Sequence, residues 1–221
     1  MQRHFHEELN LVKQKILKLG SLVEDMVAQA VGSLVDRDSP LAEEVIASDQ
    51  KVDALELEVD EDCVRLLALH QPAAGDLRFI TTAMKIISDM ERMADQAVNI
   101  CQRVVELNEE PQLKPYIDIP RMSQLSQKML RDALDAFVRM DAELARQVIP
   151  ADNKVDALKN QIFRELLTFM MEDPRTISRA TRLVLVSRHL ERIADHATNI
   201  AEMVVYLAEG KNIRHASKDD A

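Results

Sequence analysis

The stretch DQKVDAL at Asp49–Leu55 returns almost unchanged as DNKVDAL at Asp152–Leu158, with six of seven positions identical at an offset of 103 residues. A second pair, ERMADQAVNI at Glu91–Ile100 and ERIADHATNI at Glu191–Ile200, is identical at seven of ten positions at an offset of 100. Two matches at nearly the same offset predict a tandem duplication that covers most of the chain. The three residues lost between the matches indicate a loop, where HQPAAGDLR of the first copy corresponds to EDPRTISRA of the second.

The spacing of apolar residues predicts helices packed in a bundle. Steps of four and three separate the members of the first seam: Phe5, Leu9, Val12, Ile16, Leu19, Val23, Met26 and Ala30. Ser39 is the predicted N-cap, and Pro40 a first-turn residue, of a second helix that ends near His70. Further helices are predicted at about 74–107, 121–140, 142–172 and 175–208. The expected fold is all-α, a tandem duplication of a three-helix up-down-up bundle with six long helices.

Composition and charge limit the classes of protein to consider. The predicted units are a first bundle at 1–110, a proline-containing linker at 111–120, a second bundle at 121–210 and a polar tail at 211–221. With 38 acidic and 28 basic side chains, the net charge of −10 opposes binding to nucleic acid or anionic lipid. No signal segment or membrane-spanning stretch is seen, so we expect a cytoplasmic protein. Cys63 and Cys101 are expected to be reduced core thiols.

Acidic residues follow one face of the second predicted helix. Asp49, Asp53, Glu56 and Asp60 are separated by steps of four, three and four residues. At 100° per residue they lie within about 40° of one another, and Cys63 continues the same line. These carboxylates therefore interrupt an apolar seam, where like charges repel and partial burial adds a cost. The arrangement favours a bound cation.

The hairpin geometry predicts which acids face each other. If the second and third helices are antiparallel about Pro72, residues whose numbers average 72 lie opposite each other, which pairs Asp53 with Glu91 and Asp49 with Asp95. In the second copy the same construction about Asp173-Pro174 gives two further pairs: Asp156 with Glu191, and Asp152 with Asp195. Four carboxylates are therefore predicted to converge in each bundle.

Carboxylate ligands suit hard or borderline cations, so the candidates are divalent or iron-type ions such as Mg²⁺, Mn²⁺, Ca²⁺, Zn²⁺ or iron, and bridging carboxylates allow more than one ion. Possible auxiliary ligands are Asn99, Asn199, Glu56, Asp60 and His196. The two clusters differ, because Lys159 and Phe163 stand at the positions of Glu56 and Asp60. We therefore expect two related sites of unequal affinity.

Two other interpretations remain open. In a metal-free helical scaffold, the acids are neutralised by basic neighbours: Arg92, Arg192, Lys51 and Lys154. A carboxylate-bridged di-metal enzyme is disfavoured, because the Glu-x-x-His motifs of ferritin-like enzymes are absent from the sequence. The sequence also lacks a glycine-rich phosphate loop and an elbow-type nucleophile. No catalytic residue is predicted.

The paired motifs DQKVDAL/DNKVDAL and ERMADQAVNI/ERIADHATNI, with HQPAAGDLR, MMEDPRTI and GKNIRH, resemble the PhoU family of bacterial phosphate-transport accessory and regulatory proteins. The resemblance covers nearly the whole chain. It implies that the family's E(D)xxxD motifs, associated with multinuclear metal clusters, correspond here to eight acids: Asp49, Asp53, Glu91, Asp95, Asp152, Asp156, Glu191 and Asp195.

The resemblance also implies a role. Such proteins are peripheral, cytoplasmic, usually dimeric regulators and are not enzymes. They signal phosphate sufficiency by contacting the ATPase subunit of the phosphate ABC transporter and the phosphate sensor histidine kinase. The phosphate-starvation response is thereby kept off, and the membrane is reached only through these partners.

Overall fold

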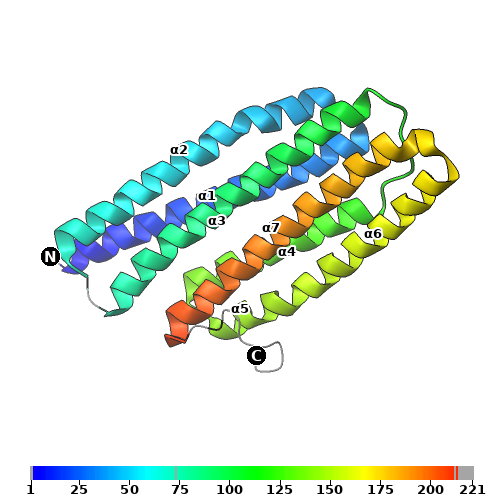
Figure 1. Ribbon diagram of the computed structural model, residues 1–221. Coiled ribbons are helices and arrows are strands. Elements are labelled where there is room, and N and C mark those ends of the chain that lie inside the picture. The colour runs from blue at the N-terminus through cyan, green and yellow to red at the C-terminus, as the bar shows by residue number, and fades with distance from the viewer. Residues whose placement is uncertain (1, 73, 212, 214–221) are drawn as a thin grey trace.

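The computed structural model describes residues 2–72, 74–211 and 213, and these residues form a bundle of long helices (Figure 1). The first repeat contains α1 (Gln2–Asp36), α2 (Ser39–His70) and α3 (Ala74–Asn108). The second contains α4 (Asp118–Arg139), α5 (Ala142–Val148), α6 (Asp152–Glu172) and α7 (Ile177–Glu209), with 3₁₀ turns η1 (Ile149–Ala151) and η2 (Pro174–Thr176). The predicted all-α fold of six long helices is confirmed.

Corresponding helices of the two repeats begin in the same way, with an aspartate as the N-cap. Asp38 is the N-cap of α2, because its carboxylate accepts a hydrogen bond from the Leu41 amide at 3.0 Å. The prediction of Ser39 as N-cap was therefore wrong: Ser39 is already helical, and Pro40 occupies the first turn, where no amide donor is needed. In the second repeat Asp141 caps α5 through the Leu144 amide, also at 3.0 Å.

The fifth predicted helix, 142–172, is divided in the structure. It forms α5, the 3₁₀ turn η1 and then α6. Pro150 lies in η1, and its ring cannot donate the hydrogen bond that an α-helix interior requires. The corresponding residue of the first repeat is Ala47, and α2 continues through it without a break.

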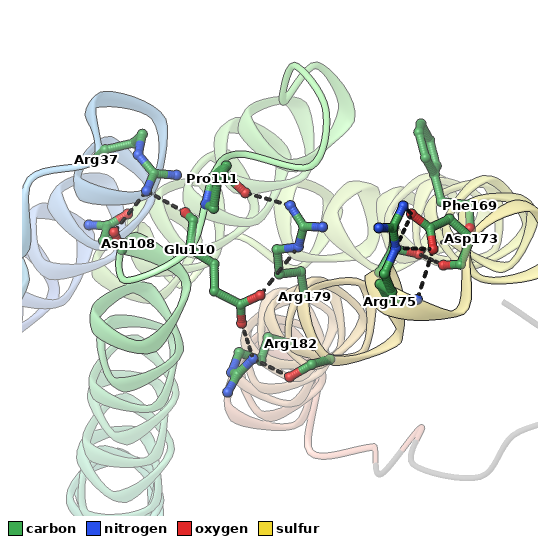
Figure 2. Close-up of polar contacts among 11 residues, drawn as sticks. Arg37, Asn108, Glu110, Pro111, Phe169, Asp173, Arg175, Arg179 and Arg182 are labelled. Atoms are coloured by element: carbon green, nitrogen blue, oxygen red, sulfur yellow. Dashed lines mark hydrogen bonds and ion pairs between the residues drawn. The ribbon is translucent and has the colours of Figure 1, made fainter.

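The linker between the repeats is bound on both sides by arginine side chains (Figure 2). Arg37 donates hydrogen bonds to the carbonyl oxygens of Asn108 at 2.8 Å and Glu110 at 2.6 Å. From α7, Arg179 donates to the Pro111 carbonyl at 2.8 Å, and Arg182 pairs with the Glu110 carboxylate at 3.2 Å. These contacts fix the connection between the two repeats.

One predicted helix boundary needs adjustment, and most of the predicted tail lies outside the described residues. Helix α4 begins at Asp118, three residues before the predicted Arg121, and therefore takes Pro120 into its first turn. Of the predicted tail, 211–221, only residues 211 and 213 lie within the described part of the chain, and Ile213 packs against the core.

The two repeats share one hydrophobic core. All eight apolar residues predicted to form the first seam are buried, and the core cluster continues through every long helix. Helices α3 and α7 pack against each other and run in opposite directions, and α1 packs against α4 (Figure 1). Cys63 and Cys101 are unpaired and buried, and burial raises the pKa of each thiol to about 12. Both are therefore unreactive core residues at neutral pH.

The contact between α1 and α4 depends on a glycine. A Cβ atom at Gly20 would lie 2.2 Å from Cδ1 of Leu134, which is buried in the core. Gly32, on the same helix, has no atom within 4 Å of the equivalent position. No helix in the described part of the chain is apolar over a stretch long enough to cross a membrane.

We expect Gly20→Val to destabilise the protein by about 1–3 kcal/mol, because the larger side chain must displace Leu134 from a packed site. Gly32→Val is the matched control, since it adds the same side chain to the same helix where there is space. Thermal unfolding followed by circular dichroism measures both. Equal midpoints for the two variants would contradict a close α1–α4 approach at Gly20.

Candidate functional site

The first acidic cluster lies between α2 and α3. It consists of Asp49, Asp53, Glu56 and Asp60 from α2, and Glu91 and Asp95 from α3. Asp49 is within electrostatic range of Asp95, and Glu91 is within range of Asp53. The members of each pair that the hairpin register predicts are thus close enough to interact electrostatically. Asp49, Glu56 and Glu91 are half-buried, whereas Asp53 and Asp95 are exposed.

The electrostatics of this cluster show that its negative charge is costly. Burial raises the pKa of Glu91, and the nearby charges of Asp95, Asp53 and Glu56 raise it further, against a smaller lowering effect of Arg92. Burial also raises the pKa of Asp49, with contributions from Asp53 and Asp95. The carboxylates of α2 and α3 therefore repel one another across the helix pair.

The cluster has no internal counter-ion among the residues that the structure describes. None of its six acids is in an ion pair there, whereas Lys15 of α1 pairs with two other acids of α2, Glu58 and Asp62, at 2.7 and 2.5 Å. Within the described residues, no group of three or more His, Cys, Asp and Glu side chains converges closely enough to hold a metal ion. The acids therefore interact electrostatically without forming a close ligand set.

The second cluster consists of Asp152 and Asp156 from α6, and Glu191 and Asp195 from α7. Here a lysine lies among the acids. Lys159 donates hydrogen bonds to Asp156 at 2.8 Å and to Glu191 at 2.7 Å, so its ammonium bridges one of the predicted facing pairs. The sequence showed that Lys159 stands where the first repeat has an acid. It did not show that the ammonium would lie between Asp156 and Glu191.

The bridging lysine changes the local electrostatics. Burial lowers the pKa of Lys159, but its hydrogen bonds to Asp156 and Glu191 outweigh burial and raise the pKa overall. Burial raises the pKa of Asp195, as do Glu191 and Asp156, while His196 and Lys159 lower it. The second cluster is therefore partly neutralised from within the chain.

The basic residues that were expected to neutralise the acids are not the ones that pair with Asp156 and Glu191. Arg92, Arg192, Lys51 and Lys154 are all exposed, and the ion pairs of Asp156 and Glu191 are made with Lys159 instead. The predicted auxiliary residues Glu56 and Asp60 belong to the first cluster. Two more of them, Asn99 and Asn199, lie one turn beyond Asp95 and Asp195 and are half-buried.

The remaining predicted auxiliary residue, His196, lies at the interface of α3 and α7. Its Nδ1 donates a hydrogen bond to the Asp89 carboxylate at 2.8 Å. His189 Nδ1 donates to the Gln96 side-chain oxygen at 2.9 Å. Positions 89 and 189, like 96 and 196, correspond in the repeat, so the two contacts are related by the pseudo-symmetry of the duplication. Sequence reasoning missed this interface, although both contacts join residues whose numbers sum to the same value.

The duplicated helical architecture is shared with a known family. The family model described as PhoU domain matches residues 16–104 and 119–204, one match in each repeat. The chain belongs to the PhoU family.

Relatives match this chain over almost its whole length. A phosphate-specific transport system accessory protein PhoU homolog of Pseudomonas aeruginosa is 44% identical over 97% of this chain and 89% of its own. The homolog from Aquifex aeolicus is 46% identical over 95% of each chain.

Solved PhoU structures have the same fold. The crystal structure of PhoU from Pseudomonas aeruginosa superposes with a TM-score of 0.89 at 45% identity, over 94% of this chain and 100% of that chain. The phosphate transport system regulatory protein PhoU from Streptococcus pneumoniae superposes with a TM-score of 0.88 at 34% identity, over 94% of this chain and 98% of that one. The six-helix arrangement is therefore that of the family.

The buried histidine of α7 leads to a prediction about pH. Burial lowers the pKa of His189 to about 4, assisted by Arg192, Arg103 and Arg188. An unfolded chain binds a proton at this histidine below about pH 6.5, whereas the folded protein does not until about pH 4. This histidine therefore makes the protein less stable as pH falls from about 6.5 to 4.

We expect His189→Gln to lower the unfolding midpoint at pH 7, because it alters the buried contact with Gln96, and to weaken the decline of the midpoint between pH 6.5 and 4. Thermal unfolding at several pH values from 7 to 4 gives the midpoint at pH 7 and its slope with pH, for the variant and for the parent protein. The control is His4→Gln, the same substitution at an exposed histidine of α1. A slope in His189→Gln equal to that of the parent protein would contradict a neutral buried His189.

Proposed function

We propose that this protein regulates phosphate uptake and the phosphate-starvation response, as a metal-associated adaptor between the phosphate ABC transporter and its sensor histidine kinase. The observation that carries the proposal is membership of the PhoU family over both repeats, together with relatives named as accessory proteins of the phosphate-specific transport system. The direction of regulation that we propose is negative: the protein keeps the response off when phosphate is sufficient.

The architecture supports an adaptor. Long helices that share one core present wide, rigid faces, and the acidic clusters lie on the outer helix pairs, α2–α3 and α6–α7. With a net charge of −10, the protein suits basic surfaces of partner proteins. We therefore propose that the ATPase subunit of the transporter and the histidine kinase dock on these faces. In this proposal the protein is a cytoplasmic homodimer without catalytic activity.

The first cluster supports the metal association. Its donors are all carboxylates, which suit Mg²⁺, Mn²⁺ or iron, and their mutual repulsion is relieved when a cation binds. Asp49, Asp53, Glu91 and Asp95 are the residues that would hold the ion, after small rotations that bring their oxygens together. A bound ion would neutralise charge between α2 and α3. The alternative is a metal-free scaffold, which agrees with the finding that no three potential ligands converge within the described residues.

The regulatory role is tested in a bacterium from which the gene for this protein has been deleted. We expect a phosphate-starvation reporter to be high in phosphate-rich medium in the deletion strain and low after the gene is restored. Affinity purification of the tagged protein should recover the transporter ATPase subunit and the histidine kinase. A reporter that responds normally to phosphate in the deletion strain would rule out negative regulation.

The metal association is tested on purified, chelator-treated protein. Mn²⁺ at a hundred times its Kd would stabilise the folded protein by about 2.7 kcal/mol. We therefore expect it to raise the unfolding midpoint by about 5–10 °C. Asp53→Asn combined with Glu91→Gln should abolish this shift. The same double variant should be slightly more stable without metal, because two repelling charges are removed. Glu43→Gln, an exposed acid of α2 outside the cluster, is the control.

A further inference from the structure

We infer that Lys159 acts as a built-in cation that closes the second acidic cluster to metal, so that only the first repeat binds a divalent ion. This inference deepens the proposed metal association and rests on it. It concerns the four acids of the second cluster, Asp152, Asp156, Glu191 and Asp195, which by sequence pattern are equivalent to metal-ligand candidates of the first.

The position of the ammonium carries the inference. Lys159 Nζ lies 2.8 Å from Asp156 Oδ1 and 2.7 Å from Glu191 Oε1, on α6 and α7 respectively. A metal ion bridging the two helices would need these same carboxylates. A divalent cation entering here must displace the ammonium or bind beside a positive charge, and both cost free energy.

The site is sheltered enough for this ion pair to persist. The side chains of Lys159 and Glu191 retain only 28% and 20% of their exposure, so the contact is screened less by water and salt than a surface pair. An ammonium with two carboxylate acceptors also forms charge-assisted hydrogen bonds, which are stronger than neutral ones. Lys159 is thus held between the helices.

The surrounding groove has changed its charge in the same sense. A cavity of about 380 Å³ beside the ion pair is lined by Lys159, Phe163, Arg188 and Glu191, among others. The counterparts of the first three in the first repeat are two acids and a serine: Glu56, Asp60 and Ser88. Two cations and a phenyl ring thus replace two carboxylates and a hydroxyl. These positions therefore carry more negative charge in the first repeat than in the second.

The inference is tested by exchanging the residues at positions 56 and 159 between the repeats. Chelator-treated full-length protein is titrated with Mn²⁺, and bound metal is followed by loss of the free-ion signal in electron paramagnetic resonance. Glu56→Lys should weaken the binding of the parent protein about tenfold or more, and Lys159→Glu should add a second class of binding sites. The double exchange should leave one class of sites, now in the second repeat.

Further substitutions locate the metal. Asp156→Asn should leave Mn²⁺ binding of the parent protein unchanged, but should remove the binding gained by Lys159→Glu. Circular dichroism establishes that each variant is folded, and Lys159→Met is the substitute if the glutamate variant does not fold. It keeps the aliphatic stem but removes the charge, so it should also open the second cluster.

The outcomes separate this inference from the proposed function. Loss of Mn²⁺ binding in the parent protein through Asp156→Asn or Glu191→Gln would overturn the inference and leave the metal association intact. Absence of binding in the parent protein would overturn the metal association. In that case, gained binding in Lys159→Glu or Lys159→Met would still support a lysine that closes the second cluster. No gain in either variant would overturn it.

Discussion

The antiparallel packing of α3 against α7 is the contact on which the remaining structure depends. It joins the two repeats into one core and makes each repeat the partner of the other. Its polar contacts, from His196 to Asp89 and from His189 to Gln96, follow the same pseudo-symmetry as the sequence. Because α3 and α7 bury one face against each other, their other faces remain for α2 and α6. The acidic clusters consequently lie at the outer helix pairs rather than at the centre of the molecule.

In both repeats the hairpin register brings acids of two antiparallel helices near one another, so that their charges repel. The two repeats differ in how this charge is balanced. The negative charge of acids on neighbouring antiparallel helices either remains unbalanced or is neutralised by a nearby cation. Between α2 and α3, the pKa of Glu91 and that of Asp49 are raised by burial and by neighbouring acids. Between α6 and α7, the ammonium of Lys159 lies between two of the acids. The two repeats therefore share the antiparallel helix pair but differ in its charge.

Periodicity and repeat matching predicted the helices well, because the apolar seam of α1 follows from spacing alone. Spacing also brought Asp53 within electrostatic range of Glu91. Local chemistry was less predictable. Both Asp38 and Ser39 are good N-cap types, and only the backbone geometry shows that Asp38 accepts the hydrogen bond. The break at Pro150 could have been predicted, since proline opposes a helix interior. The direction of the Lys159 side chain could not, because spacing places its Cβ but not its ammonium.

In the proposed metal association, the charge of individual residues, rather than membership of the PhoU family, determines which cluster would hold an ion. A cation bound only between α2 and α3 would act on that helix pair, because Lys159 of α6 already joins α6 to Glu191 of α7. Metal-dependent changes in packing would then begin in the first repeat. They could reach the second repeat only through α3 and α7, or through α1 and α4, the helix pairs that join the halves. The duplication would thus combine one metal-responsive half with one half whose charge is fixed by its own sequence.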